Sequence, residues 1–283
     1  MKGRWNNLVD ALWHRPVATM DRSAMSLKRW FESPLGQVIL EQQRPLIASV
    51  LEEQHKLEVA LAISPAGGLL LQGCGLNSMQ KVQLCPGRRS LNYGVNEGFT
   101  PLLADLDAVP LNDSSVDFVL LHHTLEFSTD PHQVLREAIR ALAPGGQLLI
   151  VGFNPWSMVG LRRWLAGMTR GGAPWAHHSL SIARLVDWMH LMSCDIEGVA
   201  RGFYGLPLQQ RRGMQLFAPL DRGLAHLAAP ASGFYMLHAQ KRLFSRSGRL
   251  QTQSRSHDMI GLPVSAPAAR QPHLKLVYKA DKP

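Results

Sequence analysis

Two adjacent histidines, His122 and His123, follow a largely apolar stretch from Val116 to Leu121. An imidazole changes its protonation near neutral pH, so it is well suited to accept a proton from a reacting group. The stretch is typical of a buried strand, and ligands of parallel sheets meet the residues at the carboxyl ends of such strands. His122 and His123 are therefore candidate catalytic bases, with a purely structural role as the alternative.

Two glycines, Gly73 and Gly75, flank Cys74 one residue after the apolar run Leu69 to Leu71. If those leucines form a strand, this spacing lets the backbone approach a ligand closely, or it serves only a tight turn. Asp105 follows a second expected strand around Pro101 to Leu103. We expect the glycines and Asp105 to form two walls of one site at the edge of the sheet.

The segment from Ala104 to Phe153 supplies the scaffold for these residues. It contains the stretch at Val116, a helix opened by Asp130-Pro131, a Pro144-Gly145-Gly146 turn and a second apolar strand that ends at Phe153. Two buried strands joined by a helix make a βαβ unit. The sequence therefore predicts an α/β fold with a doubly wound, mostly parallel sheet.

Other elements are predicted on both sides of this unit. Helical spacing of apolar residues from Ser26 through Leu61 indicates one or two N-terminal helices limited by Pro34 and Pro45, and Ser179 is the expected N-cap of a helix that runs to Met192. The remaining expected elements are a strand at 90–95, a helix at 214–228, and strands at 195–204 and 234–239 that form an antiparallel closing edge.

The central motifs resemble those of class I S-adenosylmethionine-dependent methyltransferases, particularly the type 11 group, which have a Rossmann-like fold. The matching stretches are Gly73-Cys74-Gly75, Asp105, Val109-Pro110-Leu111 with Asp113 to Asp117, Asp130-Pro131, and Arg140 to Gly146. The resemblance covers roughly residues 66 to 240. It implies methyl transfer from S-adenosyl-L-methionine to an acceptor that the sequence does not identify.

The resemblance also implies which residues meet the cofactor. Gly73, Cys74 and Gly75 would approach its methionine part, Asp105 would accept a hydrogen bond from the adenine amino group beside the Leu106 N–H, and Leu121 and His122 would border the sulfonium. Asn96 is the nearest candidate for the ribose hydroxyls, with Glu97 as the neighbouring alternative. No metal is expected, because the histidines show no ligand spacing.

Three positions depart from the family pattern. Leu71 stands where an acidic residue is common, Asn77 where a third glycine is common, and no acidic residue clearly closes the second strand. These departures favour an alternative in which the protein keeps the fold but acts as a non-catalytic binding or regulatory module. A dinucleotide-dependent oxidoreductase is a third reading, opposed by Ser78 where a GxGxxG motif needs glycine.

The net charge of +9 belongs to the ends of the chain, since residues 1–30 carry +4, residues 241–283 carry +7 and the rest carry −2. We expect a basic leader at 1–25, with Met20 or Met25 as alternative starts, N-terminal helices at 26–65, the methyltransferase-like domain at 66–243 and a disordered tail at 244–283. The tail could contact nucleic acid weakly through phosphates or serve only solubility. The expected location is the cytoplasm, because no secretory signal or membrane span is recognisable.

Overall fold

The computed structural model describes residues 20–52, 57–65, 70, 80–88, 90–91, 95, 98–157, 180–204 and 231–242. All of them lie in one compact unit, Met1–Arg242. The predicted leader before residue 20, the glycines Gly73 and Gly75, Asn96, the helix at 214–228 and the basic tail lie outside the described residues. In the part of the chain that is described, no helix is long and apolar enough to cross a membrane.

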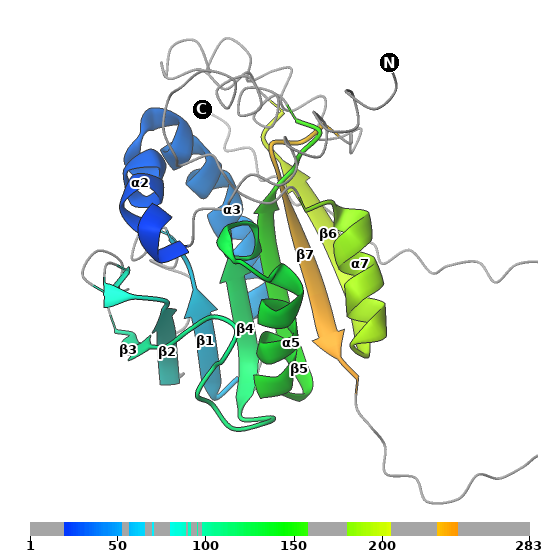
Figure 1. Ribbon diagram of the computed structural model, residues 1–283. Coiled ribbons are helices and arrows are strands. Elements are labelled where there is room, and N and C mark those ends of the chain that lie inside the picture. Colours follow the sequence, from blue (N-terminus) through cyan, green and yellow to red (C-terminus); the bar gives the residue numbers. More distant parts are fainter. Residues whose placement is uncertain are drawn as a thin grey trace, which may run out of the picture. The chain divides into compact units, whose positions relative to one another are not determined.

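A seven-stranded sheet with the order β3-β2-β1-β4-β5-β7-β6 forms the centre of the fold (Figure 1). Strands β1 to β5 run parallel, and β7 is antiparallel to both of its neighbours. The strands are β1 Val59–Ile63, β2 Gln80–Cys85, β3 Thr100–Leu103, β4 Val116–His122, β5 Leu142–Phe153, β6 Cys194–Gly202 and β7 Phe234–Lys241. The doubly wound fold and its antiparallel closing edge are confirmed, and the strand order reverses between β1 and β4.

The first strand lies earlier in the chain than we expected. It is Val59–Ile63, whereas Leu70, in the expected strand, is a turn residue. The helical spacing that we extended to Leu61 was wrong, because a short apolar run fits a buried strand as well as a helix. Residues 59–63, which we assigned to the N-terminal helices, thus belong to the sheet, and the turn after the first strand begins at Ser64.

The second strand was also misplaced. It is Gln80–Cys85, whereas Ser90 and Leu91, in the expected strand, are helical. Its first half is polar and its burial increases only toward Cys85, so the apolar pattern that marks an inner parallel strand is weak. The strand that contains Pro101 to Leu103 is confirmed as β3.

Four described helices accompany the sheet, and their bounds refine the predictions. They are α2 Met20–Glu32, α3 Pro34–Glu52, α5 Pro131–Ala141 and α7 Ile182–Leu191. Residues 20–25, expected in the leader, belong to α2, and α3 continues through Pro45. Asp130 caps α5 by accepting the Gln133 N–H at 3.0 Å, as predicted, but α7 is capped by Ser181 rather than Ser179.

The helices cover both faces of the sheet. Val119 and Leu121 of β4 pack in the same cluster as α5 and α7, while Phe118 and Leu120 pack in the cluster that contains α3. This alternation is the period-two pattern of a strand buried on both sides. It places the side chain of the next residue, His122, on the α3 face.

Candidate functional site

The carboxyl end of β4 brings His122 and His123 together. His122 is the last residue of the strand, and His123 has a left-handed backbone (φ 46°) while its N–H donates to the Val151 carbonyl oxygen at 2.8 Å. The turn keeps the second ring on the same side as the first, with the ring centroids 4.5 Å apart. Both rings contact Phe31 of α2, at centroid distances of 5.3 and 5.5 Å.

The carboxamide of Gln43, on α3, contacts both imidazoles. Gln43 Oε1 lies 3.0 Å from His122 Nε2, and Gln43 Nε2 lies 3.1 Å from His123 Nε2. On the other side of the first ring, His122 Nδ1 lies 2.9 Å from the hydroxyl of Ser64, the residue that follows β1. Gln43 thus joins the N-terminal helices to the ends of two central strands.

A buried carboxylate completes this arrangement. Glu126, in the short 3-10 helix η2 (Leu125–Phe127), accepts the Phe153 N–H with one oxygen, and its other oxygen lies 3.3 Å from His123 Nδ1. Thr124 Oγ1 donates to the Ile63 carbonyl oxygen at 3.0 Å, which ties this segment to the end of β1. We call Gln43, Ser64, His122, His123 and Glu126 the buried polar cluster.

The buried polar cluster holds both imidazoles neutral. Burial lowers the pKa of His122 well below its usual value, with a further contribution from His123, and burial lowers the pKa of His123 to about 3. Burial, followed by the charge of Glu126, also raises the pKa of Tyr235 on β7. Both histidines are fully buried, so they meet α2 and α3 rather than solvent in this arrangement.

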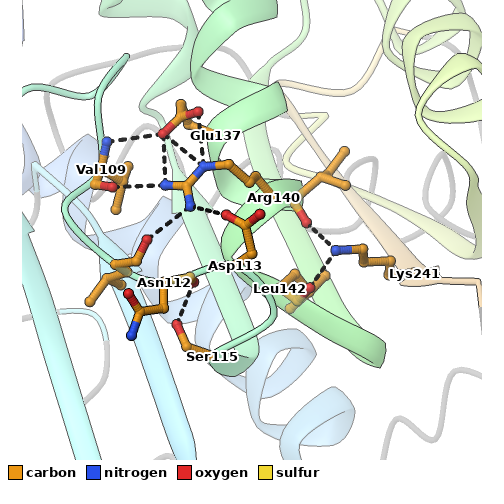
Figure 2. A network of polar contacts seen from close by, with 10 residues as sticks. Val109, Asn112, Asp113, Ser115, Glu137, Arg140, Leu142 and Lys241 are labelled. Atoms are coloured by element: carbon orange, nitrogen blue, oxygen red, sulfur yellow. Dashed lines mark hydrogen bonds and ion pairs between the residues drawn. The ribbon is translucent and has the colours of Figure 1, made fainter.

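The loop after β3 carries the second set of predicted residues. Asp105 is exposed, while Leu106 beside it is buried in the cluster that also contains β4 and α5. Arg140 of α5 fastens the far part of this loop by donating to the carbonyl oxygens of Val109 at 2.8 Å and Leu111 at 2.9 Å (Figure 2). The position of the loop is therefore set by a helix that comes later in the chain.

Arg140 also has two acidic partners. Its guanidinium lies 2.9 Å from Glu137 and 2.5 Å from Asp113, and the hydrogen bond from Arg140 is the main cause of the lowered pKa of Glu137 (Figure 2). Glu137 Oε2 in turn accepts the Val109 N–H at 3.2 Å. Both the N–H and the carbonyl oxygen of Val109 are thus bonded to α5, which makes the loop a defined part of the fold.

Several residues of this site were not among the predicted ones. Gln43 was missed, although it lies four residues from both Ile39 and Ile47 on the buried stripe of α3, where a polar side chain is a signal. Ser64 was missed because the first strand was misplaced, and Glu126, which is only 2% exposed, was not among the candidates either. No group of three or more metal-ligating side chains occurs among the residues that the structure describes.

Comparison with known proteins identifies relatives. A family model described as a methyltransferase domain matches residues 77–150. The uncharacterized protein YafS of Escherichia coli is 32% identical over 198 residues, which cover 70% of this chain and 78% of YafS. The ubiquinone/menaquinone biosynthesis C-methyltransferase UbiE of Hahella chejuensis is 32% identical over 93 residues, which cover 32% of this chain and 35% of UbiE.

A solved structure supports the fold assignment. An S-adenosylmethionine-dependent methyltransferase of Thermotoga maritima superposes with a TM-score of 0.56 at 19% identity, covering 79% of this chain and 98% of that chain. At this identity the likeness concerns the fold.

The chemistry of the described residues fits S-adenosylmethionine. The exposed Asp105 carboxylate can accept a hydrogen bond from an amino group. Neutral imidazoles at the end of β4 carry no positive charge that would repel a sulfonium. The protein belongs to the class I S-adenosylmethionine-dependent methyltransferase family, in its type 11 group, and S-adenosyl-L-methionine is its cofactor.

Proposed function

We propose that this protein transfers a methyl group from S-adenosylmethionine to an oxygen, nitrogen or carbon nucleophile of an acceptor, at the carboxyl edge of β1 and β4. The observation that carries the proposal is the contact of His122 Nδ1 with the Ser64 hydroxyl at 2.9 Å. It joins the turn after β1 to the end of β4, where the strand order reverses and where ligands of open α/β sheets bind.

Two sets of residues would hold the cofactor. Asp105 and Leu106 would receive the adenine ring, and Leu121 with His122 would border the methionyl and sulfonium end. Gly73, Cys74, Gly75 and Asn96 complete the proposed contacts, and Ser64 joins them because it follows β1 directly.

The bound cofactor supplies a methyl group that is already activated by its sulfonium. The work of the chain is then to orient donor and acceptor in line and to exclude water. A protonated nucleophile also needs a base, for which His122 and His123 are the candidates. Because both rings are buried under α2 and α3, these helices must move before an acceptor reaches them.

One observation favours the alternative of a non-catalytic binding module. In the described part of the chain, β2 ends at Cys85 and is followed by Pro86 and Gly87, so no acidic residue at this strand end is available for ribose hydroxyls. A module of this kind would retain the fold without transferring methyl groups. The tail at 244–283 would then be its candidate contact with nucleic acid.

Methyl transfer is tested with tritium-labelled S-adenosylmethionine and fractionated cell extract. Labelled acceptor and S-adenosylhomocysteine should appear together with the wild-type protein. The Asp105→Ala variant should require about tenfold more cofactor for the same rate, since it loses one hydrogen bond, whereas Asp107→Ala, an exposed change in the same loop, should behave as wild type. Equal rates for all three proteins would remove Asp105 from the site.

A further inference from the structure

We infer that Gln43 is a positioning residue that fixes His122 and His123 in opposite neutral tautomers, with the proton of His122 on Nε2 and that of His123 on Nδ1. The inference deepens the proposed function and rests on it only for the consequence for catalysis. The tautomers themselves follow from the contacts of the buried polar cluster.

The assignment begins at Glu126. An ionised carboxylate only accepts hydrogen bonds, and one of its oxygens already accepts the Phe153 N–H. The other oxygen lies 3.3 Å from His123 Nδ1, an electrostatic contact rather than a well-aligned hydrogen bond. A nitrogen that faces a carboxylate in a buried site carries its proton, because a lone pair there would be repelled. His123 therefore has its hydrogen on Nδ1 and its lone pair on Nε2.

The carboxamide of Gln43 transmits this choice to the second ring. The lone pair of His123 Nε2 requires a donor, which the Gln43 amide nitrogen supplies at 3.1 Å. The amide oxygen then faces His122 Nε2 at 3.0 Å, so this nitrogen carries a proton. His122 Nδ1 is left with a lone pair, to which the Ser64 hydroxyl donates at 2.9 Å.

The reversed orientation of the carboxamide is unfavourable. Exchanging the oxygen and nitrogen of Gln43 would require the hydrogen of His123 on Nε2, which would direct the lone pair of Nδ1 at Glu126. The side chains of Gln43, His123 and Glu126 are each no more than 2% exposed, so water does not screen that repulsion. The cluster thus has one consistent direction of hydrogen bonding from Ser64 to Glu126.

The tautomers give the two histidines different chemistry. The lone pair of His123 Nε2 is covered by the Gln43 amide, and the Nδ1–H of the same ring faces the Glu126 carboxylate. A base whose second nitrogen is oriented by a carboxylate is a common catalytic arrangement. His122 instead presents a proton at Nε2. Withdrawal of α3 would uncover the lone pair of His123, so His123 is the base of the proposed methyl transfer, and Gln43 controls its availability.

The tautomers are measured directly by long-range proton–nitrogen NMR of the full chain with 15N-labelled histidine. At neutral pH, the resonances of His122 should show the Nε2–H pattern and those of His123 the Nδ1–H pattern, each assigned in the wild type by the signals that disappear when that histidine is substituted. The same tautomer for both rings, or a protonated ring, would overturn the inference. This measurement needs no cofactor or acceptor.

Matched substitutions on α3 test the role of Gln43. Gln43→Met retains the side-chain length but neither donates nor accepts, so His122 should lose its fixed Nε2–H form and populate both tautomers, while Glu126 keeps His123 in its Nδ1–H form. Gln37→Met removes a single hydrogen bond from the same helix, to the Phe31 carbonyl oxygen at 3.1 Å, and should leave both patterns unchanged. An unchanged His122 pattern in Gln43→Met would exclude the positioning role.

A second variant replaces the hydrogen-bond donor at position 43 by an acceptor. In Gln43→Glu a carboxylate replaces the donor opposite His123 Nε2, so the ring should gain a second proton and titrate at higher pH than in the wild type. The charged or titratable groups around that ring would be the carboxylate introduced by the substitution, Glu126, His122 and, beyond Glu126, Tyr235. A His123 that stays neutral with the Nδ1–H pattern would contradict the assignment. If the tautomers are as stated but S-adenosylhomocysteine does not bind, the proposed function fails and the positioning of the rings stands.

Discussion

His123 Nδ1 lies 3.3 Å from the Glu126 carboxylate, and neither side chain is more than 2% exposed. A base and an acid are thus held away from water at the carboxyl end of β4. Since burial disfavours the charged imidazole, the folded protein keeps His123 neutral at a pH where the unfolded chain protonates it. The free energy of unfolding therefore depends on pH in the acidic range.

The free energy of unfolding should fall as the pH decreases from about 6.5 to 5. Among the described residues, three histidines have lowered pKa values, His122 well below its usual value, His123 to about 3 and His238 to about 4, in each case mainly through burial. The unfolded chain binds these protons first, so each of the three should cost about 2 kcal/mol over this interval. Urea unfolding at several pH values measures the slope.

Single substitutions separate these contributions. His238→Gln should remove about a third of the pH dependence, because His238 is one of the three histidines with a lowered pKa. The substitution should disturb little else, since among the hydrogen bonds described this partly buried ring contacts only the Gln147 side chain, at 2.8 Å. His123→Gln should remove a similar share. A flat stability between pH 6.5 and 5 in the wild type would show that the rings are protonated in the folded state.

Arg140→Lys should lower the free energy of unfolding by about 2 kcal/mol. A lysine ammonium cannot reproduce the guanidinium fork that binds Val109, Leu111, Asp113 and Glu137 together (Figure 2). Thermal and urea unfolding measure the loss. Arg136→Lys, an exposed change on the same helix, should alter stability by no more than about 0.5 kcal/mol, and an equal effect of both changes would refute the role of the network.

Lys241→Met should cost about 1 to 2 kcal/mol. The Lys241 ammonium donates to the carbonyl oxygens of Ile139 at 2.7 Å and Leu142 at 2.6 Å, where α5 ends and β5 begins (Figure 2). The neighbouring Arg242→Met is the control, because its ion pair with Asp195 is about half exposed and should contribute less than the Lys241 hydrogen bonds do. A larger loss for Arg242→Met in urea unfolding would contradict this ranking.

The parts of the fold that local chemistry determines could be predicted from the sequence. Asp130 accepts a hydrogen bond from Gln133, three residues away, so the start of α5 is visible in the sequence itself. The strand at Val116 is similarly marked by its apolar composition. In contrast, β1 is recognised only through its pairing with β2 and β4, and Val59 to Ile63 alone fit a helix equally well.

The buried polar cluster could not be predicted in the same way. Gln43 and His122 are 79 residues apart, and Ser64 and His122 are 58 residues apart, so no local pattern joins them. The position of His122 and His123 at a strand end was predicted, because it depends only on β4. Their partners depend on how α3 packs on the sheet, which the sequence pattern does not specify.

Calorimetric titration of the wild-type protein with S-adenosylhomocysteine tests the central claim most directly, because it requires neither an acceptor nor turnover. We expect saturable binding with one site per chain, weakened about tenfold in Asp105→Ala through the loss of one hydrogen bond and unchanged in Asp107→Ala. Absence of binding at millimolar ligand to a protein that is folded by circular dichroism would contradict the account and leave the non-catalytic module as its function.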